Sequence, residues 1–429
     1  MPSTVRSCSP AATHSQDGTL FVALELSLSH WLVAVSAPDA SKVSKHRVPA
    51  CDGPALLALL DRLRRQAEAR RGGVVGVVSI QEAGRDGFWV HRLLEAHGVQ
   101  SQVVDPASIA VNRRSRRAKT DRIDAEGLLR ALMAWSRGER QVCSMVRPPT
   151  REAEDARRLT REREALVTER TRHANRIKGL LATQGVFGFE PTWQARRARL
   201  DELRTPEGQR LPPQLMAEIL RQIERLELTM RQIASVEAER DAALAAECQA
   251  EDQAGAALAS PEGPAPAAPV LPPSAALPRA TGRETFGSSA RDGAGARLLR
   301  LKGIGPETAS VLRLEAFHRS FGNRREIAAY AGLTPTPWKS GGLDTEQGIS
   351  KSGNARLRRT MVQVAWFWLR NQPQSALSAW YRERVGDGRG RIKRIAIVAL
   401  ARKPLIALWR LVTQGIVPEG AELKVARAA

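Results

Sequence analysis

The feature that most constrains the fold of this chain is a low-complexity stretch, residues 249–296, dominated by alanine, proline, glycine and serine. Proline recurs at six positions between Pro261 and Pro273. Such a composition buries too little apolar surface to offset the conformational entropy lost on folding. We therefore predict a flexible linker here, with separately folded parts before and after it. The length of 429 residues fits two or three domains.

The first part shows the alternation of strands and helices that is typical of an α/β domain. Short β-prone runs at 20–26, at 31–36 and near Arg47 are followed by a helical pattern at 54–71, a valine-rich strand at 74–80 ending in Gln81 and Glu82, a helix at 91–97, a strand at 99–105 and a helix at 121–135. This order favours a mixed or parallel sheet covered by helices. We predict such a domain over residues 20–140, after a polar leader at 1–19.

The rest of the chain has helical patterns. Residues 151–248 are charge-rich, and from Met216 to Ile233 apolar residues recur at spacings of three and four, which is typical of a helix–helix seam. A long helical hairpin within one chain and a coiled coil between two chains explain this seam equally well. We predict a compact helical domain over residues 297–417, followed by a tail at 418–429.

Net charge makes nucleic acid the leading partner class. The chain has 66 Lys and Arg against 45 Asp and Glu, a net charge of +21 with a pI near 11.0, and such an excess attracts polyanions. The four cysteines are too widely spaced for a zinc finger or a disulfide framework. Two tyrosines leave little for a tyrosine-recombinase mechanism. Neither a signal peptide nor a membrane span is recognisable, so we expect a cytoplasmic protein with no membrane partner.

Four carboxylates form a candidate metal site in the first part: Glu25, Glu82, Asp121 and Asp124. The glutamates lie on strands, and the aspartates share one face at the start of a helix. Converging carboxylates can hold a pair of Mg²⁺ ions, which stabilise both oxygens of an in-line phosphoryl displacement. The alternative is that Asp121 caps its helix, Asp124 pairs with an arginine, and the glutamates are ordinary surface acids.

A dense basic loop lies between these acids in sequence. Its cations are Arg113, Arg114, Arg116, Arg117 and Lys119. Beside acids that need a polyanionic substrate, they predict contact with a phosphate backbone. A solvated basic loop is the alternative.

The segment from Gly303 to Pro306, Gly-Ile-Gly-Pro, suggests a turn between helices. Its exposed N–H groups would grip a DNA phosphate, as in a helix-hairpin-helix motif. Purely structural glycines are an equally good interpretation.

Ser340 is a candidate nucleophile. Pro335 and Pro337 stiffen the chain before it, and two glycines follow, so we expect an exposed loop where a serine could attack a phosphate. Nearby cations are Lys339, Lys351, Arg356, Arg358 and Arg359. The alternative is a flexible connection, because serine needs activation before it is a nucleophile.

Taken together, these segments resemble a known family. Glu82-Ala83, Val104-Asp105-Pro106 and Arg117-Ala-Lys-Thr-Asp-Arg-Ile-Asp-Ala125 resemble the N-terminal domain of the DEDD insertion-sequence transposases, the IS110 (IS one-ten) family. Gly303–Pro306, Ala329-Tyr-Ala-Gly-Leu-Thr-Pro335, Ser340-Gly341, Lys351-Ser-Gly-Asn354 and Leu357-Arg358 look like its C-terminal transposase domain. The resemblance covers about residues 20–140 and 297–370.

This resemblance implies a first domain folded like the Holliday-junction resolvases of the ribonuclease H superfamily. It implies that Glu25, Glu82, Asp121 and Asp124 are catalytic and hold Mg²⁺ or another divalent cation. It further implies that Ser340 joins covalently to DNA, and that a guide RNA made from the element's own ends selects the DNA. One departure is Glu25, where the family usually has Asp, because the extra methylene shifts the carboxylate.

We therefore predict an RNA-guided DNA transposase or recombinase in which the two halves share strand cleavage and exchange at a composite site. We expect a nucleoid-associated bacterial homo-oligomer, a dimer or tetramer. Besides the basic loop, the predicted nucleic-acid contacts are Lys302, Gly303, Gly305, Lys339, Lys351, Asn354 and Arg358. The alternatives are a metal-dependent DNA junction nuclease whose second part only binds DNA, and a catalytically decayed DNA-binding copy in which Glu25 no longer completes the metal site.

Overall fold

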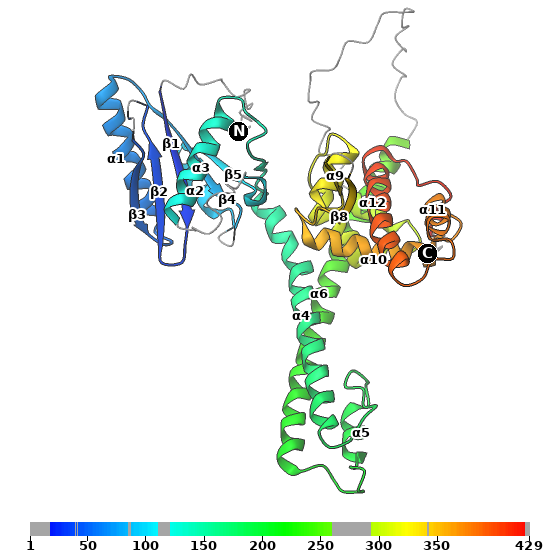
Figure 1. Ribbon diagram of the computed structural model, residues 1–429. Coiled ribbons are helices and arrows are strands. Elements are labelled where there is room, and N and C mark those ends of the chain that lie inside the picture. The colour runs from blue at the N-terminus through cyan, green and yellow to red at the C-terminus, as the bar shows by residue number, and fades with distance from the viewer. Residues whose placement is uncertain are drawn as a thin grey trace, which may run out of the picture. The chain divides into compact units, whose positions relative to one another are not determined.

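The computed structural model describes residues 18–38, 40, 42–84, 87–109, 121–259, 293–340 and 343–424. It divides the chain into two compact units, residues 1–150 and 151–429 (Figure 1). The basic loop with Arg113, Arg114, Arg116, Arg117 and Lys119 lies outside the described residues. The side chains of Asp121, Lys339 and Ser340 also lie outside the description.

A six-stranded mixed sheet forms the first unit. Its strands are β1 (Thr19–Leu26), β2 (His30–Ser36), β3 (Ser44–Pro49), β4 (Gly76–Glu82), β5 (Gln100–Val104) and β6 (Met145–Val146), in the order β3-β2-β1-β4-β5-β6. β1, β4 and β5 run parallel, whereas β2, β3 and β6 join by antiparallel pairing. The predicted α/β domain is confirmed. β6 was not predicted, because two residues are too few to show a pattern.

Three helices cover the two faces of this sheet, as Figure 1 shows. α1 (Gly53–Arg71) and α2 (Trp89–Ala96) pack on the face formed by alternate residues such as Leu20 and Val22 of β1. α3 (Asp121–Ser136) packs on the other face, where Phe21 and Ala23 point. Both faces are apolar, which is typical of a sheet whose parallel strands are covered by helices on both sides.

A long antiparallel helical hairpin begins the second unit. It consists of α4 (Arg151–Ala182), a short α5 (Arg196–Glu202) and α6 (Pro213–Ala259). Arg163 pairs with Glu237 and Arg176 with Glu218, so the residue numbers run in opposite directions along the two helices. The predicted seam is buried within this hairpin, with Ile219, Ile223 and Leu226 packed near Ile177 and Leu181.

α6 extends past the boundary predicted for the linker. Residues 249–259 are helical, and α7 (Ala294–Leu299) begins inside the same predicted stretch. The stretch up to Ala259 is rich in Ala and has no proline, which favours continuation of the helix. An ion pair between Glu251 and Arg297 joins α6 to α7.

The C-terminal part of the second unit is helical with one β-hairpin. Its elements after α7 are α8 (Pro306–Leu312), the π-helical segment η5 (Arg313–Phe317), α9 (Arg324–Tyr330), β7 (Pro335–Ser340), β8 (Leu343–Ile349), α10 (Ala355–Asn371), α11 (Ala376–Val385) and α12 (Arg391–Gln414). The core contains Trp368 of α10 and Leu400 and Leu405 of α12. The predicted helical character of this region is confirmed, and the β7–β8 hairpin within it was not predicted. Pro335 and Pro337 disfavour a helix but are tolerated in an edge strand.

The predicted tail is partly folded against this domain. Leu423 forms an isolated β-bridge with Leu301, and the backbone N–H of Lys424 donates to the carbonyl oxygen of Arg300 at 2.7 Å. Residues 418–424 therefore belong to the folded domain as far as the chain is described.

Candidate active site and nucleic-acid interface

The sheet register places two of the predicted acids on neighbouring strands. Ala23 lies opposite Ile80 and Leu24 opposite Gln81 in the parallel β1–β4 pair, so Glu25 and Glu82 are the next residues along. Glu25 follows Phe21 and Ala23 on the face covered by α3, and Glu82 follows Ile80 on that same face. Both glutamates are partly buried. Two carboxylates therefore gather at one edge of one apolar face.

The other two acids belong to α3, which packs on this face. Asp121 is the first residue of α3, one turn before the buried Ala125, and Asp124 is partly buried. This confirms the predicted helix start. Among the side chains that the structure describes, no group of three or more His, Cys, Asp or Glu could hold a metal ion. Asp121 is not among those side chains. Carboxylate oxygens of Glu25, Glu82 and Asp124 have the donor chemistry that suits Mg²⁺.

Ser340 is the last residue of β7, not part of a loop. It lies opposite Leu343, the first residue of β8, in the β7–β8 pair. The base of this hairpin is fixed by two bonds between its flanking residues. The N–H of Ser350 donates to the carbonyl oxygen of Thr334 at 2.9 Å, and the Thr334 hydroxyl donates to the Ser350 hydroxyl at 3.2 Å.

Gly332, before the hairpin, and Gly353, after it, allow two backbone segments to approach each other closely. Gly332 has φ +66°, and a Cβ there would lie 2.0 Å from the carbonyl oxygen of Ser352. Gly353 has φ +80°, and a Cβ there would lie 2.4 Å from the carbonyl oxygen of Tyr330. Any other residue would push the two loops apart. The Ala-Gly-Leu and Ser-Gly-Asn motifs thus pack together beneath the Ser340 hairpin.

Asn354, a predicted nucleic-acid contact, is used within the fold. Its Oδ1 accepts from the N–H of Leu357 at 3.0 Å and so caps α10. Its Nδ2 donates to Glu315 Oε2 at 3.0 Å and to the Tyr330 hydroxyl at 3.3 Å. Both polar atoms of the amide are therefore engaged with protein atoms.

Glu315, which the sequence analysis missed, is the centre of a buried ionic cluster. Its side chain is 3% exposed, and Arg161 Nε of α4 donates to Oε1 at 3.1 Å. Burial alone would raise the pKa of Glu315, but the hydrogen bonds from Arg161 and Asn354 and the charges of Arg161 and Arg157 hold this pKa below its ordinary value. The sequence feature that could have revealed this buried acid is a single Glu within the mostly apolar segment Val311–Phe317.

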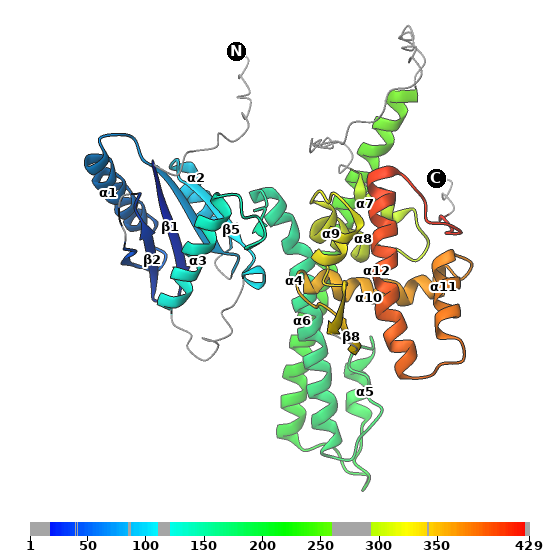
Figure 2. The same ribbon diagram turned by 45° about the horizontal axis from the view of Figure 1, so that its top comes forward.

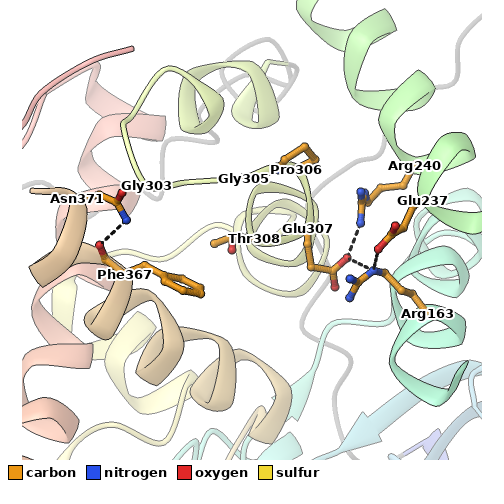
Figure 3. A pocket seen from close by; sticks show the side chains of 10 residues that line it. All are labelled: Arg163, Glu237, Arg240, Gly303, Gly305, Pro306, Glu307, Thr308, Phe367 and Asn371. Carbon is orange, nitrogen blue, oxygen red and sulfur yellow. Dashed lines mark hydrogen bonds and ion pairs between the residues drawn. The ribbon is translucent and has the colours of Figure 1, made fainter. Parts of the chain in front are cut away.

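A second ionic cluster lines a pocket of about 300 Å³ beside the Gly303–Pro306 turn (Figure 3). Glu307 Oε2 lies 2.8 Å from Arg240 Nη1 and 3.4 Å from Arg163 Nε. Both arginines are thus paired with an acid. A Cβ on Gly303, whose φ is +90°, would lie 2.8 Å from Asn371 Cβ, so packing against α10 is one reason for this glycine.

Most of the cations singled out in the second unit are engaged with other protein atoms. Arg356 and Arg359 both pair with Glu164 of α4, and Lys302 pairs with Glu422 at 2.7 Å. Arg358 donates to two backbone carbonyl oxygens. Lys351 is exposed, with a left-handed backbone at φ 57°. Several of these cations therefore hold the fold together.

Comparison with known proteins adds sequence likeness to this geometry. Residues 27–184 match the family model described as "Transposase" and named DEDD_Tnp_IS110, and residues 295–379 match the family described as "Transposase IS116/IS110/IS902 family". The first match includes Glu82, Asp121 and Asp124 but begins after Glu25, and the second includes Ser340.

Relatives with curated names span most of the chain. "Putative transposase y4rJ" of Sinorhizobium fredii is 51% identical over 97% of both chains. The transposase for insertion sequence element IS1328 of Yersinia enterocolitica is 28% identical, over 70% of this chain and 73% of its own. The transposase for IS1111A of Coxiella burnetii is 26% identical, over 79% and 78%. None of the described helices is long and apolar enough to cross a membrane.

Proposed function

The chain belongs to the IS110 family of DEDD insertion-sequence transposases, and from this premise we propose how its two units act on DNA. The first unit has a ribonuclease H-like, resolvase-like fold whose carboxylates assist phosphodiester chemistry. The second unit supplies Ser340 as the nucleophile. Together they cleave and exchange DNA strands.

One observation carries the proposal for the first unit. The β1–β4 register brings Glu25 and Glu82 to adjacent strands on the face covered by α3, and α3 begins with Asp121 and Asp124. Carboxylate oxygens suit divalent cations such as Mg²⁺, and Glu25, Glu82, Asp121 and Asp124 would hold them. When bound, such ions stabilise negative charge on the reacting phosphate oxygens. The four acids would fix where that charge is stabilised.

Ser340 takes the covalent step. Its Oγ attacks the phosphorus of a DNA phosphodiester, so a new O–P bond forms as the P–O bond to the leaving strand breaks. The serine proton passes to solvent, and the leaving strand ends as a hydroxyl after taking up a proton. A hydroxyl of a second strand then displaces the serine and restores the phosphodiester. Support comes from the position of Ser340 at the end of β7, opposite Leu343 at the start of β8.

We also propose that an RNA from the ends of the element guides DNA choice and that the protein acts as a homo-oligomer. Contacts to nucleic-acid backbones would come from the basic loop at 113–119, from Lys339 and Lys351, and from the helix-hairpin-helix-like turn with Lys302, Gly303 and Gly305. Asn354 and Arg358 position these loops through the hydrogen bonds described above.

The test is a search for a covalent protein–DNA adduct. Full-length protein is incubated with Mg²⁺, RNA transcribed from the flanking DNA and matching labelled DNA, and adducts are resolved under denaturing conditions. We expect an adduct that disappears in Ser340→Ala. Ser352→Ala is the matched control, because Ser352 is an exposed serine of the same domain with no assigned role in the reaction.

Other outcomes identify other functions. DNA that is cleaved without any adduct would establish a hydrolytic junction nuclease. Intact DNA that remains bound would point to a decayed copy, and Glu25→Asp then tests whether the first acid is the defect.

A further inference from the structure

The start of α12 carries a group of exposed cations. Arg389, Arg391, Lys393 and Arg394 are all exposed, and within the described chain no side-chain hydrogen bond or ion pair engages any of them. We call these four residues the α12 basic corner. No Asp or Glu occurs between Asp387 and Glu419. This differs from the ion-paired arginines of α4 and α6.

The turn between α11 and α12 holds the backbone that carries these cations in a defined position. The turn between α11 and α12 contains Gly386 at φ 48° and Gly390 at φ 51°, values that glycine adopts readily. A Cβ on Gly388 would lie 2.8 Å from Ile392 and from the carbonyl oxygen of Val385, so the turn is tight. α11 and α12 lie side by side (Figures 1 and 2). The α12 basic corner is therefore built on packed helices.

Its charges work against helix stability. α12 begins at Gly390 with no side-chain cap and no acid in its first turn, whereas α9, α10 and α11 begin with the capping side chains of Asn323, Asn354 and Ser375. The N-terminus of a helix carries a partial positive charge, so cations there are unfavourable. Arg391 and Arg394, three residues apart, also repel each other. A site that is unfavourable for folding is consistent with a ligand of opposite charge.

We propose that the α12 basic corner binds the phosphate backbone of duplex DNA without regard to base sequence. The charge complementarity is direct, and cations that do not first have to leave an acid can replace the counterions of DNA. A lipid surface fits less well, because Ile392 and Ile395 are exposed but the next residues, Ala396 and Ile397, are buried in the core. The proposal rests on the transposase family and not on the roles of Ser340 or the carboxylates.

The test compares two full-length variants that each lose four positive charges. The first is Arg389→Gln, Arg391→Gln, Lys393→Gln and Arg394→Gln. The control is Arg64→Gln, Arg176→Gln, Lys178→Gln and Arg197→Gln, whose cations pair with acids. Binding to a mixed-sequence DNA duplex is measured without divalent cations at several KCl concentrations. Because no cleavage is needed, the result is independent of the proposed chemistry.

We expect the dissociation constant of the first variant to rise about 10- to 100-fold at 0.1 M salt and its log–log salt slope to fall by about 3 to 4. The control should change much less. Equal changes in both variants would overturn the proposal, because net charge alone would then explain the loss. Binding to duplex RNA and to anionic phospholipid vesicles is measured in the same way. A first variant that loses affinity for one of these ligands but not for DNA would also overturn the proposal.

Thermal unfolding separates loss of binding from loss of fold. The first variant should melt at or above the temperature of the parent chain, because the cations leave the positive end of α12. If it melts lower, the milder pair Arg391→Gln and Arg394→Gln decides the question. That pair should reduce the salt slope by about 2, and an unchanged slope in a folded pair would overturn the proposal.

Discussion

The two units of this transposase use charged side chains in opposite ways. In the first unit both faces of the sheet are apolar, and Glu25 and Glu82 stand where strands end. In the second unit charge reaches the interior, where Glu315 and Glu307 join α4 and α6 to the C-terminal helices. The acids at the strand ends stand beside the packed faces of the sheet, whereas the acids between helices join elements of the fold. The net charge of +21 therefore overstates the cationic surface that is open to nucleic acid.

Removing the buried acid of the second unit should have the largest effect. Glu315→Ala leaves Arg161 and Arg157 without their buried partner, so we expect the second unit to lose about 3–5 kcal/mol of unfolding free energy. Hydrogen exchange should report faster exchange in α8 to α10 and no change in β1. The exposed Glu169 of α4 is the control, and Glu169→Ala should change stability by less than about 0.5 kcal/mol. An equal loss of unfolding free energy in Glu315→Ala and Glu169→Ala would contradict a special role for the buried acid.

An acid of the first unit should behave in the opposite way. Glu82→Gln keeps the size of the side chain but removes its charge, so we expect strand transfer to fall about 100-fold or more with little change in thermal unfolding. Adduct yield and melting temperature are measured together. Glu95→Gln, at a carboxylate that accepts from the N–H of Ser101, should retain activity. A large loss of stability in Glu82→Gln would assign Glu82 to the fold.

Acid should weaken the second unit selectively. Because the pKa of Glu315 lies below its ordinary value in the folded chain, this group binds protons more readily when unfolded. Its stabilisation is complete above the unfolded pKa, near 4.3, and is lost as pH falls through the folded pKa. Urea unfolding below about pH 4.5 should therefore become easier, by less than the effect of Glu315→Ala. In Glu315→Gln this part of the pH dependence should be absent.

The unusual first acid should have a moderate effect. The shorter side chain of Glu25→Asp restores the length that the family usually has, and a catalytic carboxylate tolerates only small displacements. We expect a severalfold rise in Mg²⁺-dependent adduct formation, measured as an initial rate. A fall would mean that this site has adjusted to glutamate.

The smallest effect is expected at a surface pair of the first unit. Asp61 pairs with Arg64 one turn further along α1, and both are exposed. Asp61→Asn should change unfolding free energy by about 0.5 kcal/mol or less, because solvent screens such pairs. A change of several kcal/mol in a chemical denaturation curve would contradict the distinction between exposed and buried pairs.

Local periodicity was enough to predict the sheet of the first unit, the start of α3 at Asp121 and the hairpin seam, because these depend on residues close in sequence. The Glu315 cluster was not predictable in this way. Arg161 and Glu315 are 154 positions apart, and nothing local says which arginine of α4 meets which acid. Ser340 was predicted to lie in an exposed loop, but it is the last residue of β7, because Pro335 and Pro337 made a strand hard to recognise from the sequence. The two glutamates were predicted as members of a cluster of four acids, and only the register places them on adjacent strands.

The length of α6 has a mechanical consequence. Its 47 residues make one continuous rod of about 70 Å, from the hairpin end near Pro213 to its contacts with α7. A rod of that length works as a lever, because a tilt of about one degree at one end moves the other by about 1 Å. Arg240, which pairs with Glu307 beside the Gly303–Pro306 turn, lies about 40 Å along this rod from Pro213, so the same tilt about the hairpin end moves it by about 0.7 Å.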